Sequence, residues 1–169
     1  VASPLLRAQQ TAAPLADRLG LPIKTDVRLL ESTNKFEGTS FKDGYLKLLE
    51  PRYLRYLWNP LRPSWGEPYK SVATRMWSAV LDAKETARGH EAVLVSHQLP
   101  IWICRLHAER RSFVHNPRNR QCTLCSLSSF TFSGDELVSV GYSEPAGDLI
   151  PRADRKDNFS AGGSEEQTS

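Results

Sequence analysis

Two side chains, Arg7 and His97, lie at positions in the sequence that suit anion binding and proton transfer. Arg7 lies in the first turn of a predicted helix, where a guanidinium adds a bidentate donor to the free N–H groups of the helix end. His97 directly follows an apolar run, and its imidazole titrates near neutral pH. A solvated surface arginine and a structural histidine are the alternatives at these positions.

Two carboxylates, Glu31 and Glu37, lie in a polar segment that follows a short predicted strand. Either can serve as a general acid if the segment overhangs the same edge as His97. Either can also be an ordinary loop carboxylate, and their spacing does not choose between them.

The elements that must position these residues alternate between helix and strand. Apolar residues at helical spacing predict a helix over 4–19, capped by Ser3 and ended by Gly20. The other predicted elements are a strand at 22–27, a helix from Val72 ended by a cap at Gly89, a buried strand at 92–95, a helix from Pro100 to about Glu109, and a hairpin of strands 122–132 and 137–142.

This alternation predicts an α/β fold with a mostly parallel central sheet flanked by helices. Ligands of such folds bind at the carboxyl ends of the strands, next to helix N-termini. Arg7 and His97 both fit that rule.

Composition sets the class of protein. The 169 residues are 40% hydrophobic and 24% charged with a net charge of +3, which predicts one globular domain over 1–150 and a disordered tail over 151–169. The charge is too small to indicate nucleic acid, and no apolar run is long enough to span a membrane. Without a signal peptide and with three cysteines expected as free thiols, the chain is predicted to be cytoplasmic.

Four motifs appear in the order typical of one family. They are the stretch Ala2-Ser-Pro-Leu-Leu-Arg-Ala-Gln-Gln-Thr-Ala12, Leu30-Glu31 followed by Phe36-Glu-Gly38, Gly66-Glu67 before a long helix, and Val93-Leu-Val-Ser-His97. Over residues 1 to about 145 the sequence resembles the histidine phosphatase superfamily, whose members are phosphoglycerate-mutase-like.

The resemblance implies a three-layer α/β sandwich and phosphomonoester hydrolysis through a phosphohistidine. Arg7 would bind the phosphoryl oxygens, and His97 would donate to the same group and stabilise its charge. Glu31 would protonate the leaving alcohol, with Glu37 as the second candidate. No metal or organic cofactor is implied, and the expected partner is a small phosphorylated substrate.

One departure concerns the nucleophile. The family carries it in an Arg-His-Gly motif, which these 169 residues lack. We therefore expect an N-terminally truncated fold and an inactive fragment without the phosphohistidine. A non-catalytic phosphate-binding pseudoenzyme is the main alternative, and a phosphoglycerate-mutase-type phosphotransferase is another.

The segment between Glu37 and Gly66 is rich in proline and aromatic residues and is expected to be a loop-rich insertion. Trp58, Arg62 and Trp65 are candidate lid residues over the substrate. Aromatic residues that merely cover the core are an equal alternative.

Two other classes of function compete. Cys104-x-x-His107 and Cys122-x-x-Cys125 imitate the spacing of a zinc site, although no glycine or proline provides the tight turn. A run of arginines suggests a nucleic-acid interface, or equally a solvated helix end or a positive rim for a phosphorylated substrate. Its members are Arg105, Arg110, Arg111, Arg118 and Arg120.

Overall fold

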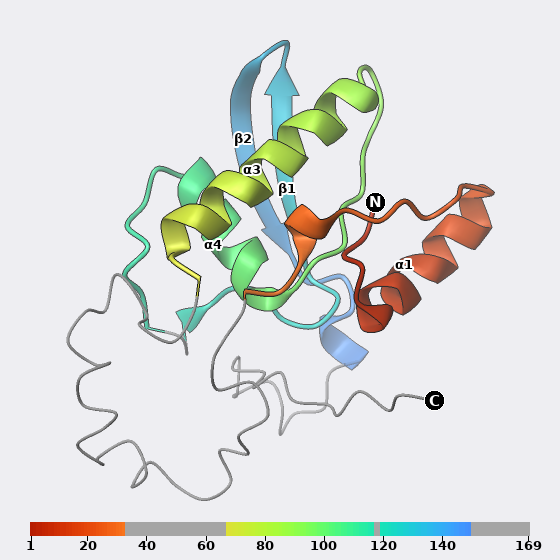
Figure 1. Cartoon of the computed structure of the whole chain (residues 1–169), viewed down its shortest axis with the longest axis horizontal. Helices are drawn as coiled ribbons and strands as arrows, with labels where there is room; N and C mark the ends of the chain where they lie inside the picture. The colour runs from red at the N-terminus through yellow and green to blue at the C-terminus, as the bar shows by residue number, and fades with distance from the viewer. Residues whose placement is uncertain (33–66, 117–118, 150–169) are drawn as a thin grey trace, which may run out of the picture.

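A computed structural model describes residues 1–32, 67–116 and 119–149 (Figure 1). The predicted lid residues, Glu37 and the predicted tail lie outside these ranges. The described elements are α1 (Leu6–Leu19), the 3-10 helix η1 (Val27–Leu29), α3 (Tyr69–Thr86), α4 (Gln98–Ala108), β1 (Leu127–Ser133), β2 (Glu136–Ser143) and the 3-10 helix η5 (Gly147–Leu149).

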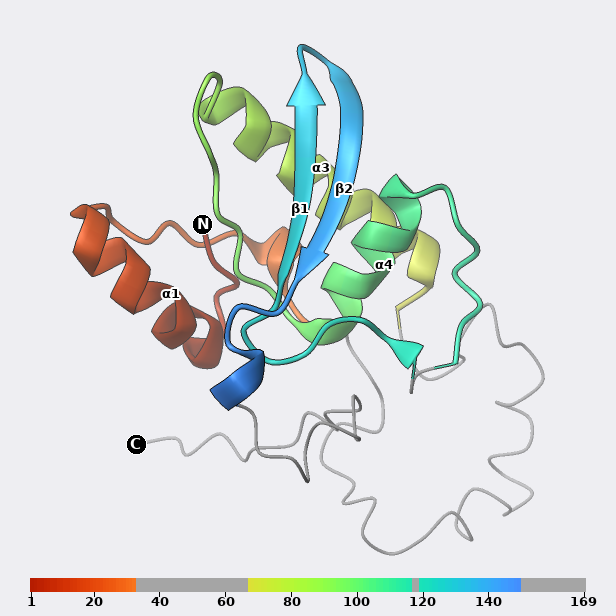
Figure 2. The same cartoon turned by 180° about the vertical axis from the view of Figure 1, so that it is seen from behind.

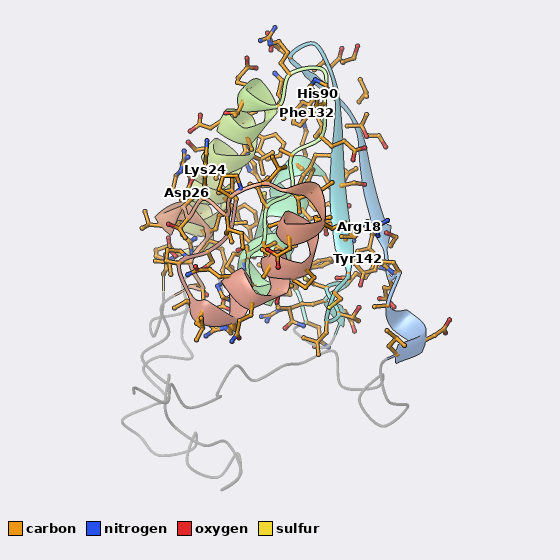
Figure 3. The ribbon with its side chains drawn as sticks, turned by 90° about the vertical axis from the view of Figure 1, so that its right-hand side faces the viewer. Arg18, Lys24, Asp26, His90, Phe132 and Tyr142 are labelled. Atoms are coloured by element: carbon orange, nitrogen blue, oxygen red, sulfur yellow. The ribbon has the colours of Figure 1, made fainter. Side chains whose placement is uncertain are left out.

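Three short segments pair in parallel beside the helices. Residues 1–3 lie between residues 24–26 and 93–95, with parallel bridges from Ala2 to Thr25 and to Val95. Ala2 N donates to Lys24 O at 2.8 Å, and Ser3 N donates to Val95 O at 2.8 Å. Figure 3 shows Lys24 and Asp26 on the side of the molecule opposite Tyr142 of the hairpin.

The predicted parallel sheet is thus present only as isolated bridges. In the described part of the chain, the one sheet of full strands is the antiparallel pair β1–β2. The prediction of a buried strand at 92–95 was also wrong in part, because Val93 is 48% exposed. Segment 92–95 pairs along one edge with residues 1–3, and the described residues place no strand on its other edge.

Helix α1 extends to one side of the other elements in both Figure 1 and Figure 2. The predicted Ser3 cap was wrong: the N-cap is Leu5, without a side-chain hydrogen bond, and Ser3 is fully buried in the parallel pairing. Gly20 ends the helix at φ 63°, a left-handed conformation that glycine adopts without strain. Ala8 is the only buried residue of the helix.

Helices α3 and α4 form the core. Their buried side chains pack together around Leu29 of η1, with Val72 and Met76 from α3 and Ile103 and Leu106 from α4. The prediction that Gly89 caps α3 was wrong. The helix ends at Thr86 with Ala87 as its C-cap, and Gly89 follows as a turn residue at φ 80°.

Helix α4 begins at Gln98, two residues before the predicted Pro100. A proline is tolerated there because N–H groups in a first turn have no helical acceptor. The earlier start makes His97 the N-cap residue, and Ile101 N donates to His97 O at 3.0 Å.

The hairpin packs against α3 on the face turned toward the viewer in Figure 2. Trp77 of α3 contacts Phe130 and Phe132 of β1, with ring centroids 5.6 and 6.1 Å away. Strand β1 starts later than predicted because Cys125 has φ 57° and Ser126 N donates to Thr123 O, which makes a turn there.

No helix among the described residues is both long and apolar enough to cross a lipid bilayer.

Ile103 tests how the core holds α4. The side chain is fully buried, so Ile103→Ala should lower the free energy of unfolding by about 2–5 kcal/mol. Leu124→Ala is the control, because Leu124 is 73% exposed and its truncation should change that energy by less than about 0.5 kcal/mol. Urea unfolding measures both, and equal losses in the two variants would contradict this packing.

Candidate active site

The parallel pairing brings Ser3 and His97 together from opposite ends of the chain. Ser3 precedes α1 and His97 precedes α4, and both follow the carboxyl ends of neighbouring extended segments. The His97 Nε2 and Ser3 Oγ atoms lie 2.8 Å apart in a buried hydrogen bond. Ser3 and His97 thus lie at the edge where the rule on strand ends places a ligand site.

Glu31 reaches the same place through η1. Ser96 Oγ donates to Leu29 O at 2.7 Å, which fixes the end of η1 beside the residue that precedes His97. The Glu31 Oε2 atom then lies 3.9 Å from His97 Nδ1. Both ring nitrogens of His97 thus face oxygen atoms, as the positioning of a catalytic imidazole requires.

Arg75 supports this arrangement and was not singled out from the sequence. Its guanidinium binds Glu67 at 2.8 Å and donates to Arg28 O at 2.6 Å, so it connects α3 to η1. Arg75 lowers the pKa of Glu67 against the opposing effect of burial. The Gly66-Glu67 motif was the available signal for this contact.

Arg7 lies in the first turn of α1 with an exposed side chain. Within the described ranges its guanidinium makes neither an ion pair nor a hydrogen bond, so its five donors are available to a ligand. Its positive charge acts on His97, which places the two side chains in one electrostatic environment.

His97 is held neutral. Burial, and then the positive charges of Arg7 and Arg75, together lower the pKa of His97 to about 4. When the Ser3 hydroxyl donates to Nε2, the single proton of the neutral ring is on Nδ1, facing Glu31. An anion bound beside Arg7 would favour the protonated imidazole.

Of the predicted site residues, the structure places Glu31 3.9 Å from His97, and the positive charge of Arg7 acts on the same imidazole. Glu37, Trp58, Arg62 and Trp65 lie outside the described residues, so the choice between the two glutamates as proton donor and the lid stay predictions. Ser3 is the positioning residue that sequence reasoning missed, because a Ser-Pro pair before a helix was interpreted as a cap.

The zinc interpretation finds no support in the geometry. Cys104 lies in the core, where burial raises the pKa of its thiol to about 12, whereas Cys125 is exposed. In residues 1–32, 67–116 and 119–149 no three His, Cys, Asp or Glu side chains are grouped closely enough to hold a metal ion.

The arginine run does not form one exposed basic face. Arg105 and Arg120 are buried, and Arg105 pairs with Glu109 at 2.8 Å. Arg111 also binds Glu109, at 2.7 Å. Two of the five arginines are thus buried, and Arg118 lies outside the described residues.

Comparison with known proteins shows the family of the chain. The model of the histidine phosphatase superfamily (branch 1) matches residues 1–145, and the chain belongs to that family. The Mycobacterium tuberculosis protein Rv0525, described as uncharacterized, is 49% identical over 146 residues, which cover 86% of this chain and 72% of the relative. A probable phosphoglycerate mutase GpmB of Yersinia enterocolitica is 29% identical over 172 residues, covering 88% and 70%.

A solved structure supports the fold. YhfR of Bacillus stearothermophilus matches with a TM-score of 0.56 and 23% identity. The match covers 68% of this chain and 57% of YhfR, so the chain spans little more than half of that protein. The phosphoglycerate-mutase-like fold is therefore shown, although its sheet is represented in the described residues by a hairpin and isolated bridges.

The low pKa of His97 has a consequence for stability. The pKa of His97 is 6.5 ordinarily and about 4 in the folded chain. Between these two pH values the unfolded chain therefore binds a proton at His97, whereas the folded chain does not. This residue should make the free energy of unfolding fall by about 3 kcal/mol as the pH drops through that window. His97→Gln should therefore flatten the pH dependence measured by urea unfolding.

His90→Gln is the matched control, because His90 is exposed. It should leave the pH dependence unchanged, and equal slopes in the two variants would contradict the buried, neutral state of His97.

Ser3→Ala tests the hydrogen bond to His97. Removing the hydroxyl leaves a buried ring nitrogen without its partner, which should cost about 1–3 kcal/mol in the free energy of unfolding and change the ¹⁵N shifts of the His97 ring. Ser78→Ala removes an exposed contact to Arg28 and should leave those ring shifts in place. Unaltered His97 shifts in the Ser3 variant would refute the positioning role.

Proposed function

We propose that this chain binds the phosphoryl group of a small phosphomonoester, as part of a phosphoric monoester hydrolase that works through phosphohistidine. The observation that carries the proposal is the approach of His97 to Glu31 at 3.9 Å, together with the positive charge of Arg7, which acts on His97 and has no ion pair in the described part. Family membership supports the same reaction class.

The roles follow from charge. The Arg7 guanidinium would bind two phosphoryl oxygens, and the N–H groups at the starts of α1 and α4 would add to the positive potential. His97, protonated as the dianion binds, would donate to a third oxygen and stabilise the charge that develops in the transition state. Glu31 or Glu37 would give its proton to the leaving alcohol.

Hydrolysis of a phosphomonoester by this polypeptide alone would require a nucleophile. The expected phosphoryl acceptor is the histidine of an Arg-His-Gly motif, and the 169 residues contain none. We therefore expect the chain on its own to bind phosphate without hydrolysing esters. The similarity to a probable phosphoglycerate mutase keeps phosphoryl transfer between alcohols as a second candidate reaction.

The experiment compares two arginines of α1. Arg7→Gln should weaken the affinity for inorganic phosphate at least about tenfold, because a charge-assisted bidentate contact is lost. Arg18→Gln is the control, since Arg18 is exposed in the last turn of the same helix. Isothermal titration calorimetry measures both dissociation constants.

Equal phosphate affinities in the two variants would overturn the proposed site. Mass spectrometry that finds a phosphohistidine on this polypeptide after incubation with a phosphomonoester would overturn the expectation of binding without turnover.

A further inference from the structure

Arg120 is a buried cation whose hydrogen-bond partner is neutral. The residue is only 8% exposed, and its Nε donates to His115 Nε2 at 3.0 Å. His115 Nδ1 lies 2.8 Å from Phe113 O, which can only accept, so Nδ1 carries the proton and Nε2 the lone pair. His115 is therefore neutral and does not compensate the charge of Arg120.

No carboxylate of the described residues lies within ion-pair distance of Arg120. Tyr69 and Cys122 adjoin it, but a phenol and a thiol are neutral near pH 7. Burial lowers the pKa of Arg120, and Tyr69, then Glu31 and Cys122, act in the opposite direction. A buried guanidinium in this state is costly unless an anion joins it.

The chain places Arg120 at the candidate active site. Gln98 follows His97, and its Nε2 donates to Cys122 O at 2.9 Å. This bond holds the segment that carries Arg120 at the N-terminus of α4. The same Glu31 carboxylate that approaches His97 also interacts with Arg120.

We propose that Arg120 is a specificity-determining residue that binds a second acidic group of the substrate, a carboxylate or a further phosphate on the alcohol portion. This inference rests on the proposed function, in which Arg7 and His97 hold the phosphoryl group. Arg120 supplies a rigid, preorganised donor, because its contact with His115 fixes the guanidinium before the ligand arrives.

The test uses phosphate esters that differ only in the second group. Ethyl phosphate, phosphoglycolate and ethane-1,2-diol bisphosphate are titrated calorimetrically into the wild-type chain, Arg120→Gln, Arg120→Lys and Arg110→Gln. Arg110 is the matched control because it is exposed in the same stretch of chain. Inorganic phosphate is titrated in parallel.

The wild-type chain and Arg110→Gln should bind a doubly acidic ester about tenfold more tightly than ethyl phosphate. This ratio of affinities should fall to about one in Arg120→Gln and should be partly kept in Arg120→Lys. Neither substitution should change the affinity for inorganic phosphate. The doubly acidic ester with the larger ratio identifies the second group as carboxylate or phosphate.

A wild-type ratio near one, or a ratio that Arg120→Gln retains, would overturn the inference. Failure of inorganic phosphate to bind the wild-type chain would instead overturn the proposed function. If Arg120→Gln does not fold by circular dichroism, the Arg120 Nε–H signal of the wild-type chain decides. It should shift with phosphoglycolate and not with ethyl phosphate, and its indifference to both would refute the proposal.

Discussion

The site depends on the parallel pairing of the first three residues with residues 93–95. Ser3 N donates to Val95 O, and two residues beyond this point lies His97. Because parallel segments end at the same edge, the pairing brings the N-termini of α1 and α4 to one place. Ser3 precedes α1, and His97 precedes α4. Without this register, Ser3 and His97, which are 94 positions apart in the sequence, would not meet.

Around that edge, two sets of contacts perform different tasks. The packing of α3 against α4 fixes the direction in which α4 starts, and Arg75 and Ser96 attach η1 to the same core. Burial then has a chemical consequence, since it keeps His97 neutral until a ligand brings negative charge. Arg7 and Arg120, the cationic side chains that would receive the ligand, have no carboxylate within ion-pair distance among the described residues.

Local patterns predicted the elements better than their ends. Helical periodicity located the helices, but residue type did not locate their caps. Ser3 was interpreted as a cap because residue type alone does not show that its backbone already pairs with Val95. Gly89 lies two residues beyond Ala87, the C-cap of α3. Strand β1 is shorter than predicted because Cys125 has a positive φ. A cysteine in this stretch of sequence does not predict a positive φ.

The same distinction applies to the site. The positions of Arg7, His97 and Glu31 followed from motif order and from the rule on strand ends. The Ser3 contact and the burial of Arg120 did not, because each joins residues distant in sequence through tertiary packing. Arg120 was counted in an arginine run as a surface charge, whereas its neighbours His115 and Tyr69 enclose it.

The most direct test of the central claim is a crystal structure of the chain with tungstate, a dense mimic of phosphate. This account predicts anomalous density between the guanidinium of Arg7 and the ring of His97, near the starts of α1 and α4. Tungstate bound elsewhere on the molecule, with that position empty at saturating concentration, would contradict it.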